Sequence, residues 1–185
     1  AKFLQGVAKK SLLSIEQHYL LALHEEELFH RKPKKDSTHC TAVGVSRSHS
    51  GTIVGQNWDW NSSYFPWSSI NRFVFRGCPK VLALSYPGLP VCAGINSAGL
   101  ALMWTGAGYY PSVEPKIGVP TYAIVLELLT RRDISSSLEY LKKTKNAGAF
   151  VFFLGDRKGN FAIVEAIPGR ILVKQHNSGH RSNVF

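Results

Sequence analysis

The segment 39–60 constrains the fold more than any other stretch, because it reads as two strands joined by a polar turn. Threonine and valine alternate with small residues over 40–45, and a second stretch rich in β-formers covers 52–58. The cluster between them consists of serine, histidine, arginine and glycine, which is typical of turns. The pattern therefore predicts a β-hairpin whose first strand begins at Cys40 and whose second strand ends at Asp59.

Hairpin arithmetic relates these two ends to each other. Paired residues of a hairpin have a constant sum of residue numbers, and a turn centred on His49 and Ser50 gives the sum 99. Cys40 then lies directly opposite Asp59, about 5 to 8 Å away at the backbone. The thiol and the carboxylate are thereby expected within hydrogen-bonding range. The simpler alternative is a buried cysteine that only packs, with an aspartate that only caps a turn.

Five short motifs follow one another along the chain: Cys40-Thr41, GQNWD at 55–59, GINSAGL at 94–100, GVP at 118–120 and Ser182-Asn183. Their ordered combination resembles the N-terminal-nucleophile hydrolases, specifically the cysteine branch that contains isopenicillin N acyltransferase, with bile salt hydrolase and acid ceramidase as more distant relatives. The resemblance implies an α+β fold, a four-layer αββα sandwich of two antiparallel sheets. It also implies a chain that is incomplete at both ends.

The resemblance further implies two parts. Residues 1–39 match the end of a leader segment, a helix followed by a basic linker, and residues 40–185 match the catalytic domain. In this family the chain cuts itself, here between His39 and Cys40, and the leader stays as a separate α chain. The new α-amine, with a reference pKa of about 7.7 to 8.0, then takes the thiol proton. Asp59 would hold the amine or thiol, and Asn183 would donate to the oxyanion.

The substrate implied is a small acylated amine or an acyl thioester, attacked by the cysteine to give an acyl-enzyme. Residues that could line an acyl pocket are Trp58, Trp60, Tyr64, Met103, Trp104 and Thr105, although aromatic side chains also serve as ordinary core. Three departures from the family matter. Arg181 and Val184 flank Asn183 where the acyltransferase has histidines, Gln56 replaces the arginine of bile salt hydrolases, and 103–106 lacks their asparagine.

Composition narrows the classes of function. The formal charge is +10, which raises the possibility of nucleic-acid binding, yet the densest basic run, 31–35, lies in the expected linker. The three cysteines form no C-x-x-C pair and no zinc-type cluster with histidine, so we do not expect a metal site. The family resemblance implies neither a metal nor an organic cofactor. No apolar run reaches the ~18 residues of a membrane span.

The remaining pattern predicts helices and strands in an α+β order. A helix is expected over 15–30, opened by the capping box Ser14–Gln17, with the acidic run 25–27 as a solvated face. Further helices are expected over 120–131 and 134–141. Strands are expected over 72–75, 81–85, 91–95, 100–105, 149–154, 161–165 and 170–174.

Three functions are thus compatible with the residues. The first is a self-processing cysteine amidohydrolase or acyltransferase. The second is an inactive relative that keeps the fold as a binding module, and the third is a basic-surface protein that binds nucleic acid without using Cys40. The acyl group, the leaving amine and the cellular compartment are not encoded in any motif of the sequence.

Overall fold

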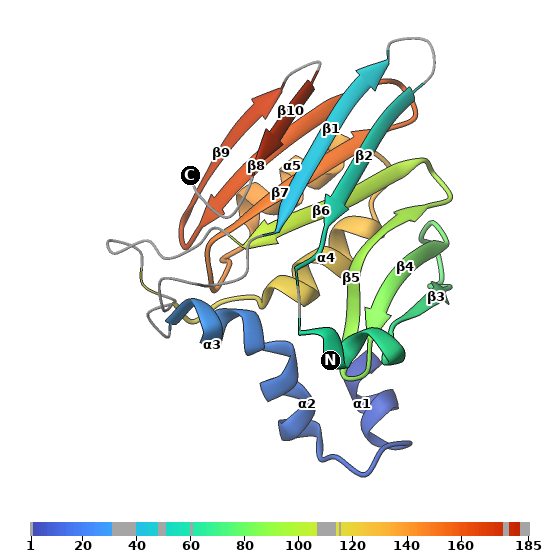
Figure 1. Cartoon of the computed structure of the whole chain (residues 1–185), viewed down its shortest axis with the longest axis vertical. Coiled ribbons are helices and arrows are strands. Elements are labelled where there is room, and N and C mark those ends of the chain that lie inside the picture. The colour runs from blue at the N-terminus through green and yellow to red at the C-terminus, as the bar shows by residue number, and fades with distance from the viewer. Residues whose placement is uncertain are drawn as a thin grey trace.

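The architecture is that of an α+β protein with two antiparallel sheets, as the sequence predicted (Figure 1). The computed structural model describes residues 2–30, 40–47, 51–59, 61–106, 114, 116–175 and 178–181. Its helices are α1 Lys2–Ala8, α2 Ile15–Ala22, α3 His24–His30, the 3-10 helix η1 Ser62–Trp67, α4 Thr121–Leu129 and α5 Ile134–Lys143. Its strands are β1 Thr41–Arg47, β2 Gly51–Asn57, β3 Ser69–Phe73, β4 Val81–Tyr86, β5 Leu89–Asn96, β6 Leu100–Gly106, β7 Phe150–Asp156, β8 Phe161–Ile167, β9 Arg170–Gln175 and β10 Ser178–Arg181.

The larger sheet has seven strands in the order β3 to β9, so every neighbour in space is also the neighbour in sequence. The smaller sheet has the order β10-β1-β2. Strands β7 and β8 are buried on both faces, which fits their continuous apolar runs FVFFLGD and FAIVEAI. These two strands carry the centre of the core, and Phe150, Phe152 and Phe153 are among its largest buried side chains.

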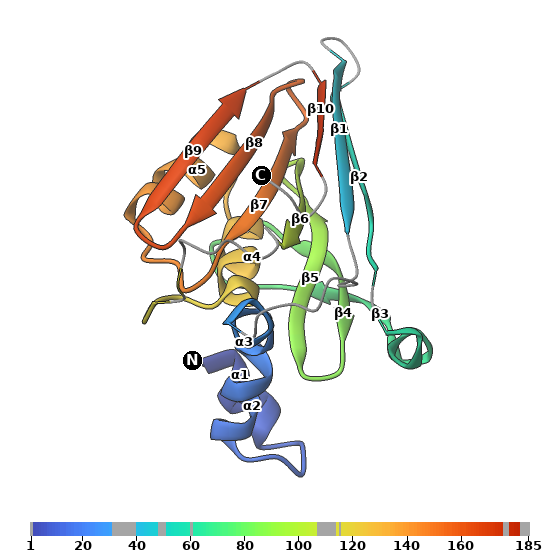
Figure 2. The same ribbon diagram turned by 60° about the vertical axis from the view of Figure 1, so that its left-hand side comes forward.

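Layers are visible when the molecule is turned (Figure 2). Helices α4 and α5 lie on one face of the seven-stranded sheet, and the three-stranded sheet covers part of the other face. The described residues thus form three layers of the expected αββα sandwich. On the outer face of the small sheet Val43, Val45 and Ile53 are 44 to 58% exposed, and no described helix covers them.

Glycine lets the two sheets approach closely. A Cβ atom at Gly44 of β1 would lie only 2.0 Å from the ring of Phe161, and one at Gly155 would lie 2.7 Å from Thr52. Any larger residue at Gly44 would push the hairpin away from β8, because the Phe161 ring is itself buried in the second core cluster. The GVS sequence of β1 therefore fixes how deeply the hairpin lies on the large sheet.

The register of the β1–β2 hairpin differs from the predicted one by a single residue. Thr41 pairs with Asn57 and Arg47 with Gly51, so the sum is 98 and three residues connect the strands. Gly51 has φ +84°, the left-handed conformation that three-residue hairpin connections require. A slip of one residue exchanges the two faces of a strand. Continued by one pair, this register sets Cys40 opposite Trp58 and not opposite Asp59.

The expected helix over 15–30 is two helices, because the chain turns at Leu23, where α2 ends. The Ser14–Gln17 capping box is present as predicted. Since α3 begins at His24, its acidic residues occupy the favourable N-terminal turn and not the C-terminal half that one long helix would give them. Helix α1 was not predicted from the sequence.

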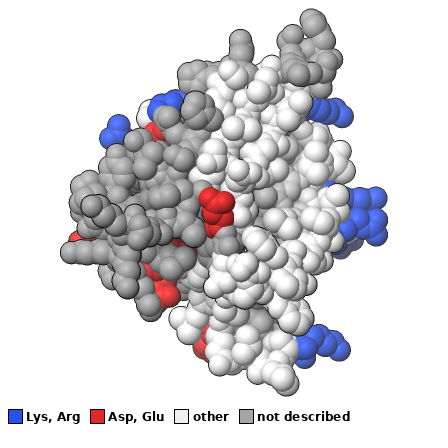
Figure 3. Space-filling model, in the orientation of Figure 1, with Lys and Arg blue, Asp and Glu red and all other residues white. Residues whose placement is uncertain are grey.

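The other elements follow the sequence with small shifts. Strands β4 to β9 and helices α4 and α5 lie where the pattern placed them, whereas β3 begins at Ser69, earlier than expected, and β10 was not predicted. The aromatic stretch expected to be a loop contains η1. None of the described helices is long and apolar enough to span a membrane. On the face shown in Figure 3, the described lysine and arginine side chains lie along the margin, and an acidic side chain lies near the centre.

Candidate functional site

Cys40 lies at the start of β1, half-buried, where the hairpin meets the large sheet. Burial raises the pKa of its thiol above the ordinary value, and the negative charges of Glu25 and Asp59 act in the same direction. Two hydrogen bonds oppose this shift, one with the main-chain N–H of Asp59 and one with the Gln56 side chain. A thiolate at this position therefore has donors ready, but the intact chain holds the thiol mostly protonated at neutral pH.

Gln56 links the thiol to the second sheet. Its side-chain amide donates to the carbonyl oxygen of Trp104, and its Oε1 accepts from the Trp104 N–H at 3.1 Å. One side chain thus pairs with both main-chain groups of Trp104, and it joins β2 to β6 although the two strands belong to different sheets. Gln56 therefore fixes the distance between the cysteine-bearing hairpin and β6, and it touches the sulfur as well.

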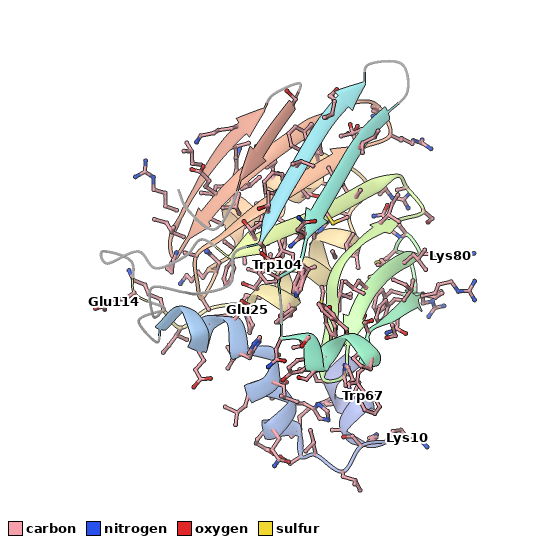
Figure 4. All side chains as sticks on the ribbon, viewed as in Figure 1. Lys10, Glu25, Trp67, Lys80, Trp104 and Glu114 are labelled. Atoms are coloured by element: carbon pink, nitrogen blue, oxygen red, sulfur yellow. The ribbon has the colours of Figure 1, made fainter. Side chains whose placement is uncertain are left out.

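Aromatic rings fill the space beneath this link. Trp104 packs edge-on against Trp58 with 5.1 Å between ring centroids, and against Tyr122 and Phe150 with 5.6 Å each. Its indole N–H donates to the carbonyl oxygen of Cys92. Trp104 is only 2% exposed, so its ring belongs to the helix-side core and its role is to support the site. Figure 4 shows Trp104 below the ends of β1 and β2.

Two glutamates of α3 reach this region from the opposite side. The Glu26 carboxylate is 5% exposed and accepts a hydrogen bond of 2.7 Å from the N–H of Thr121, the first residue of α4. The Tyr122 hydroxyl donates to Glu25 Oε1 at 2.9 Å. Burial raises the pKa of Glu25 to about 7, and the charge of Glu26 adds to the shift. The expectation that 25–27 is a solvated face is wrong for Glu25 and Glu26.

The acidic residue predicted to pair with the thiol is arranged differently. Asp59 is exposed and lies two residues after Asn57, the last paired residue of β2, so the observed register does not set it opposite Cys40. Its main chain still reaches the sulfur, because its N–H donates to the thiol. The predicted proximity of the two residues is confirmed, and the predicted carboxylate–thiol pairing is replaced by a main-chain contact.

An open, mainly apolar cavity of about 560 Å³ begins beside this site, between β2 and the strands β3 to β6. Its size is within the range of small-molecule sites. Gln56, which bonds the Cys40 thiol, connects the cavity to the site, and Trp58 and Met103 line the cavity as well. Its other lining residues are Thr52, Ile53, Val54, Ile70, Leu82, Ala83, Leu84, Ala93, Gly94, Ile95 and Ala101.

The other residues that the sequence predicted for the site do not line the cavity in the described part of the chain. Thr105 is fully buried, and its hydroxyl has no hydrogen-bond partner in the described part of the chain. Tyr64 is 43% exposed on η1 and packs against Tyr86, so it does not line the cavity. Three predicted residues lie outside the described part of the chain: His39, Trp60 and Asn183.

Sequence reasoning missed the roles of three residues: Gln56 and Glu25, which act on the thiol, and Tyr122, which binds Glu25. The sequence singled out Gln56 only as a departure from one branch of relatives. The available signal was the strand periodicity, which puts Gln56 on the same inner face of β2 as Val54. No sequence signal connects Glu25 with Tyr122, because 97 residues separate them. No group of three His, Cys, Asp or Glu that could hold a metal ion occurs within the described ranges.

Comparison with known proteins agrees with the motifs. Residues 46–184 match the family model described as acyl-coenzyme A:6-aminopenicillanic acid acyl-transferase. Conjugated bile acid hydrolase from Clostridium perfringens, solved as a mutant, superimposes with a TM-score of 0.58 at 18% identity, over 75% of this chain and 51% of that chain. Penicillin V acylase from Agrobacterium tumefaciens gives a TM-score of 0.39 at 16% identity, over 76% and 43%.

The likeness to the bile acid hydrolase shows the N-terminal-nucleophile hydrolase fold. The chain spans about half the length of that structure. None of the curated protein sequences gives a significant match.

Proposed function

Because the chain belongs to the acyl-coenzyme A:6-aminopenicillanic acid acyl-transferase family, we propose that it is a self-processing cysteine amidohydrolase or acyltransferase. The observation that carries the proposal is the setting of Cys40: the Asp59 N–H and the Gln56 side chain both bind its sulfur, next to an apolar cavity. Donors to the sulfur stabilise a thiolate, which is the nucleophilic form of cysteine.

The first reaction is the cut between the proposed leader, 1–39, and the proposed catalytic domain, 40–185. The Cys40 thiol loses its proton and attacks the His39 carbonyl carbon, and the C–N bond breaks as the amine takes up a proton. This N-to-S shift leaves a thioester between the leader and the sulfur. Water then hydrolyses the thioester, which releases the His39 carboxylate and restores the thiol.

The second reaction uses the new terminus. The free α-amine of Cys40 accepts the thiol proton, and the thiolate attacks an amide or thioester carbonyl of a small acylated substrate. The leaving amine or thiol departs with a proton, and an acyl-enzyme remains. Water completes hydrolysis, and an amine acceptor in the same place completes acyl transfer. The apolar cavity beside Trp58 and Met103 is suited to the acyl group.

Two side chains have assigned roles in this proposal. In this proposal the exposed Asp59 carboxylate accepts a hydrogen bond from the α-amine. The α-amine exists only after the cut, so the thiol contact of the Asp59 main chain in the intact chain is compatible with that role. Asn183 donates to the tetrahedral oxyanion, a contribution worth about 3 to 4 kcal/mol in comparable sites. Replacing Asn183 with alanine should then slow turnover about 100- to 1,000-fold without abolishing the fold.

The test is the denatured intact mass of the purified protein beside a Cys40→Ala control. The proposal expects two species that divide between His39 and Cys40, absent from the control. Turnover of a panel of acyl amides and thioesters should disappear in the same variant. One uncut mass from a folded protein would refute self-processing.

The second candidate is a binding module with an inert cysteine, and the raised pKa of the Cys40 thiol favours it. It expects an uncut chain and unchanged ligand binding in the Cys40→Ala variant. The same pair of proteins therefore separates the two candidates.

A further inference from the structure

The segment before the proposed cleavage bond is an integral part of the fold. Helix α2 packs against α4 and β5, and Leu21 lies against the turn between β4 and β5. A Cβ atom at Gly88 in that turn would lie 2.8 Å from Leu21 Cδ1, so a side chain there would displace the helix. The packing brings the first turn of α3 to the end of the hairpin that carries Cys40 (Figure 4).

Glu26 fixes the position of that turn. The residue before α4 is Pro120, which offers no side-chain cap, and the Glu26 carboxylate takes over this task by accepting from the Thr121 N–H. A carboxylate at a helix N-terminus is also favoured by the helix dipole. Glu26 also lies beside Gly148, where a Cβ atom would be in ordinary van der Waals contact with Glu26 Cγ at 3.5 Å. Glu26 is therefore an anchor, and its neighbour Glu25 is held in a defined place.

Glu25 is the member of the pair that reaches the reactive cysteine. It accepts from the Tyr122 hydroxyl, and the Tyr122 ring packs edge-on against Trp104. Trp104 is bound through its main chain to Gln56, whose side chain binds the Cys40 sulfur. One continuous chain of contacts thus runs from the Glu25 carboxyl to the thiol, with the buried side chains of Tyr122 and Trp104 between the two half-buried ends.

We propose that Glu25 is a positioning residue for Cys40, and that its ionisation controls how readily the Cys40 thiol is deprotonated. The inference deepens the proposed function, since it rests on Cys40 as the nucleophile, and it assigns to the leader a regulatory role in that chemistry. A negative carboxylate near a half-buried thiol opposes thiolate formation, and a neutral carboxyl does not. The effect is strong where solvent screens little.

Other titratable groups face the same space. Glu25 is next to Glu26 and bonded to Tyr122, Cys92 interacts with its charge, and His24 stacks on the Tyr122 ring at 6.4 Å. Burial raises the pKa of both Tyr122 and Cys92, so these groups keep their protons through neutral pH. Burial also raises the pKa of Glu26 and lowers that of His24. The charge of Glu25 reaches Cys40, and its pKa of about 7 means that this charge changes near neutral pH.

The sign of the effect follows from these charges. Below about pH 6 the Glu25 carboxyl is neutral, so removing its charge by mutation changes nothing at the thiol. Above about pH 8 the carboxylate is ionised, and its removal should lower the thiol pKa. The reactivity of Cys40 in an uncharged variant should therefore match the wild type in acid and exceed it in mild alkali.

The experiment measures alkylation of Cys40 by iodoacetamide between pH 5.5 and 8.5 in the wild type, Glu25→Gln and Glu27→Gln. Glutamine keeps an acceptor for Tyr122 and removes the charge. Glu27 is the matched control, since it is the same residue type in the same helical turn and is exposed. Trypsin releases residues 36–47, or 40–47 after self-cleavage, and in either peptide Cys40 is the only cysteine.

The ratio of the Glu25→Gln rate to the wild-type rate should be near 1 at pH 5.5 and rise to about 3- to 10-fold at pH 8.5. The Glu27→Gln ratio should stay near 1 throughout. A ratio of 1 at every pH, or a ratio that differs from 1 equally at every pH, would overturn the proposal, because a purely structural role moves all rates together.

Tyr122→Phe provides an independent variant that keeps the carboxyl. The hydroxyl of Tyr122 lowers the pKa of Glu25, so its loss should move the ionisation of Glu25 to higher pH. Cys40 should then react faster than in the wild type between about pH 7 and 8, and at the wild-type rate below pH 6. No shift of the profile would contradict the role of Glu25. Since alkylation is read on cut or uncut peptide alike, failure of self-cleavage would refute the proposed function without deciding this inference.

Discussion

Two regions bring acidic side chains near Cys40, and these side chains differ in their exposure to solvent. The end of β2 presents Asp59, which is exposed, whereas the first turn of α3 presents Glu25, which is half-buried, and Glu26, which is buried. The motif pointed to the first region, and the charge run suggested that the second is only a solvated surface. In the folded protein the region of α3 is expected to influence the thiol more than Asp59 does. The effect of a charge on a thiol depends on burial more than on closeness in the hairpin.

The largest effect should come from the link between these regions. Replacing Gln56 with alanine removes a donor to the sulfur and leaves the Trp104 N–H and carbonyl oxygen without their partners. We expect self-cleavage to slow about 10- to 100-fold and the protein to lose about 1 to 3 kcal/mol of stability. Intact mass over time and thermal unfolding measure the two effects. Asn57→Ala, at the neighbouring exposed position, is the control and should leave both near wild type.

The next largest effect should be a pH-dependent difference in stability between the wild type and Glu25→Gln. The pKa of Glu25 is about 7 in the folded chain against 4.5 for the free side chain, so its contribution is fully present below pH 4.5 and is lost as pH rises to 7. At pH 8 the Glu25→Gln variant should be more stable than the wild type by about 1 to 3 kcal/mol, and at pH 4.5 the two should be equal.

Urea unfolding at the two pH values measures this difference. Glu27→Gln at the exposed position should stay within about 0.5 kcal/mol of the wild type at both. A Glu25→Gln difference that is the same at pH 4.5 and pH 8 would contradict the buried charge, and the comparison between the two regions would lose its basis.

The anchor in the same turn should have a smaller effect. Glu26→Ala leaves the Thr121 N–H at the start of α4 without its acceptor, which should cost about 1 to 2 kcal/mol. Glu26→Gln retains an acceptor oxygen and should lose less. Thermal unfolding ranks the variants, and an alanine variant as stable as the glutamine variant would show that the hydrogen bond has no net value.

The smallest effect should come from the exposed carboxylate acting on the thiol of the uncut chain. Asp59→Asn should change the alkylation rate of Cys40 at pH 8.5 by less than about twofold, because solvent screens an exposed charge. Its main-chain N–H, which binds the sulfur, is unchanged by the substitution. An effect larger than that of Glu25→Gln would invert the comparison.

Much of the fold was predictable because it depends on local pattern. Alternation and turn residues located the β1–β2 hairpin, and the long apolar runs located β7 and β8. The capping box at Ser14 marked the start of α2, and Pro120 marked the start of α4. These signals act over a few residues, so neighbours along the chain suffice to read them.

The candidate site was predictable only in part. The sequence identified Cys40 and the proximity of Asp59, and it included Trp58 and Met103, which line the cavity. It misjudged the hairpin register by one residue, because the length of a polar connection fixes which face each side chain takes and composition does not report that length. It also placed Trp104 at the pocket, although its ring is core.

By itself, then, the sequence determined the order of β4 to β9 with α4 and α5 between β6 and β7, the position of the cysteine at the start of a hairpin and the family to which the chain belongs. Only the tertiary structure decided which groups surround the thiol. Tyr122 binds Glu25 across a separation of 97 residues, and Trp104 holds Gln56, which bonds the thiol, across a separation of 48 residues. Such contacts depend on how layers pack, and burial, which sets the pKa of Glu25, exists only after the layers have met.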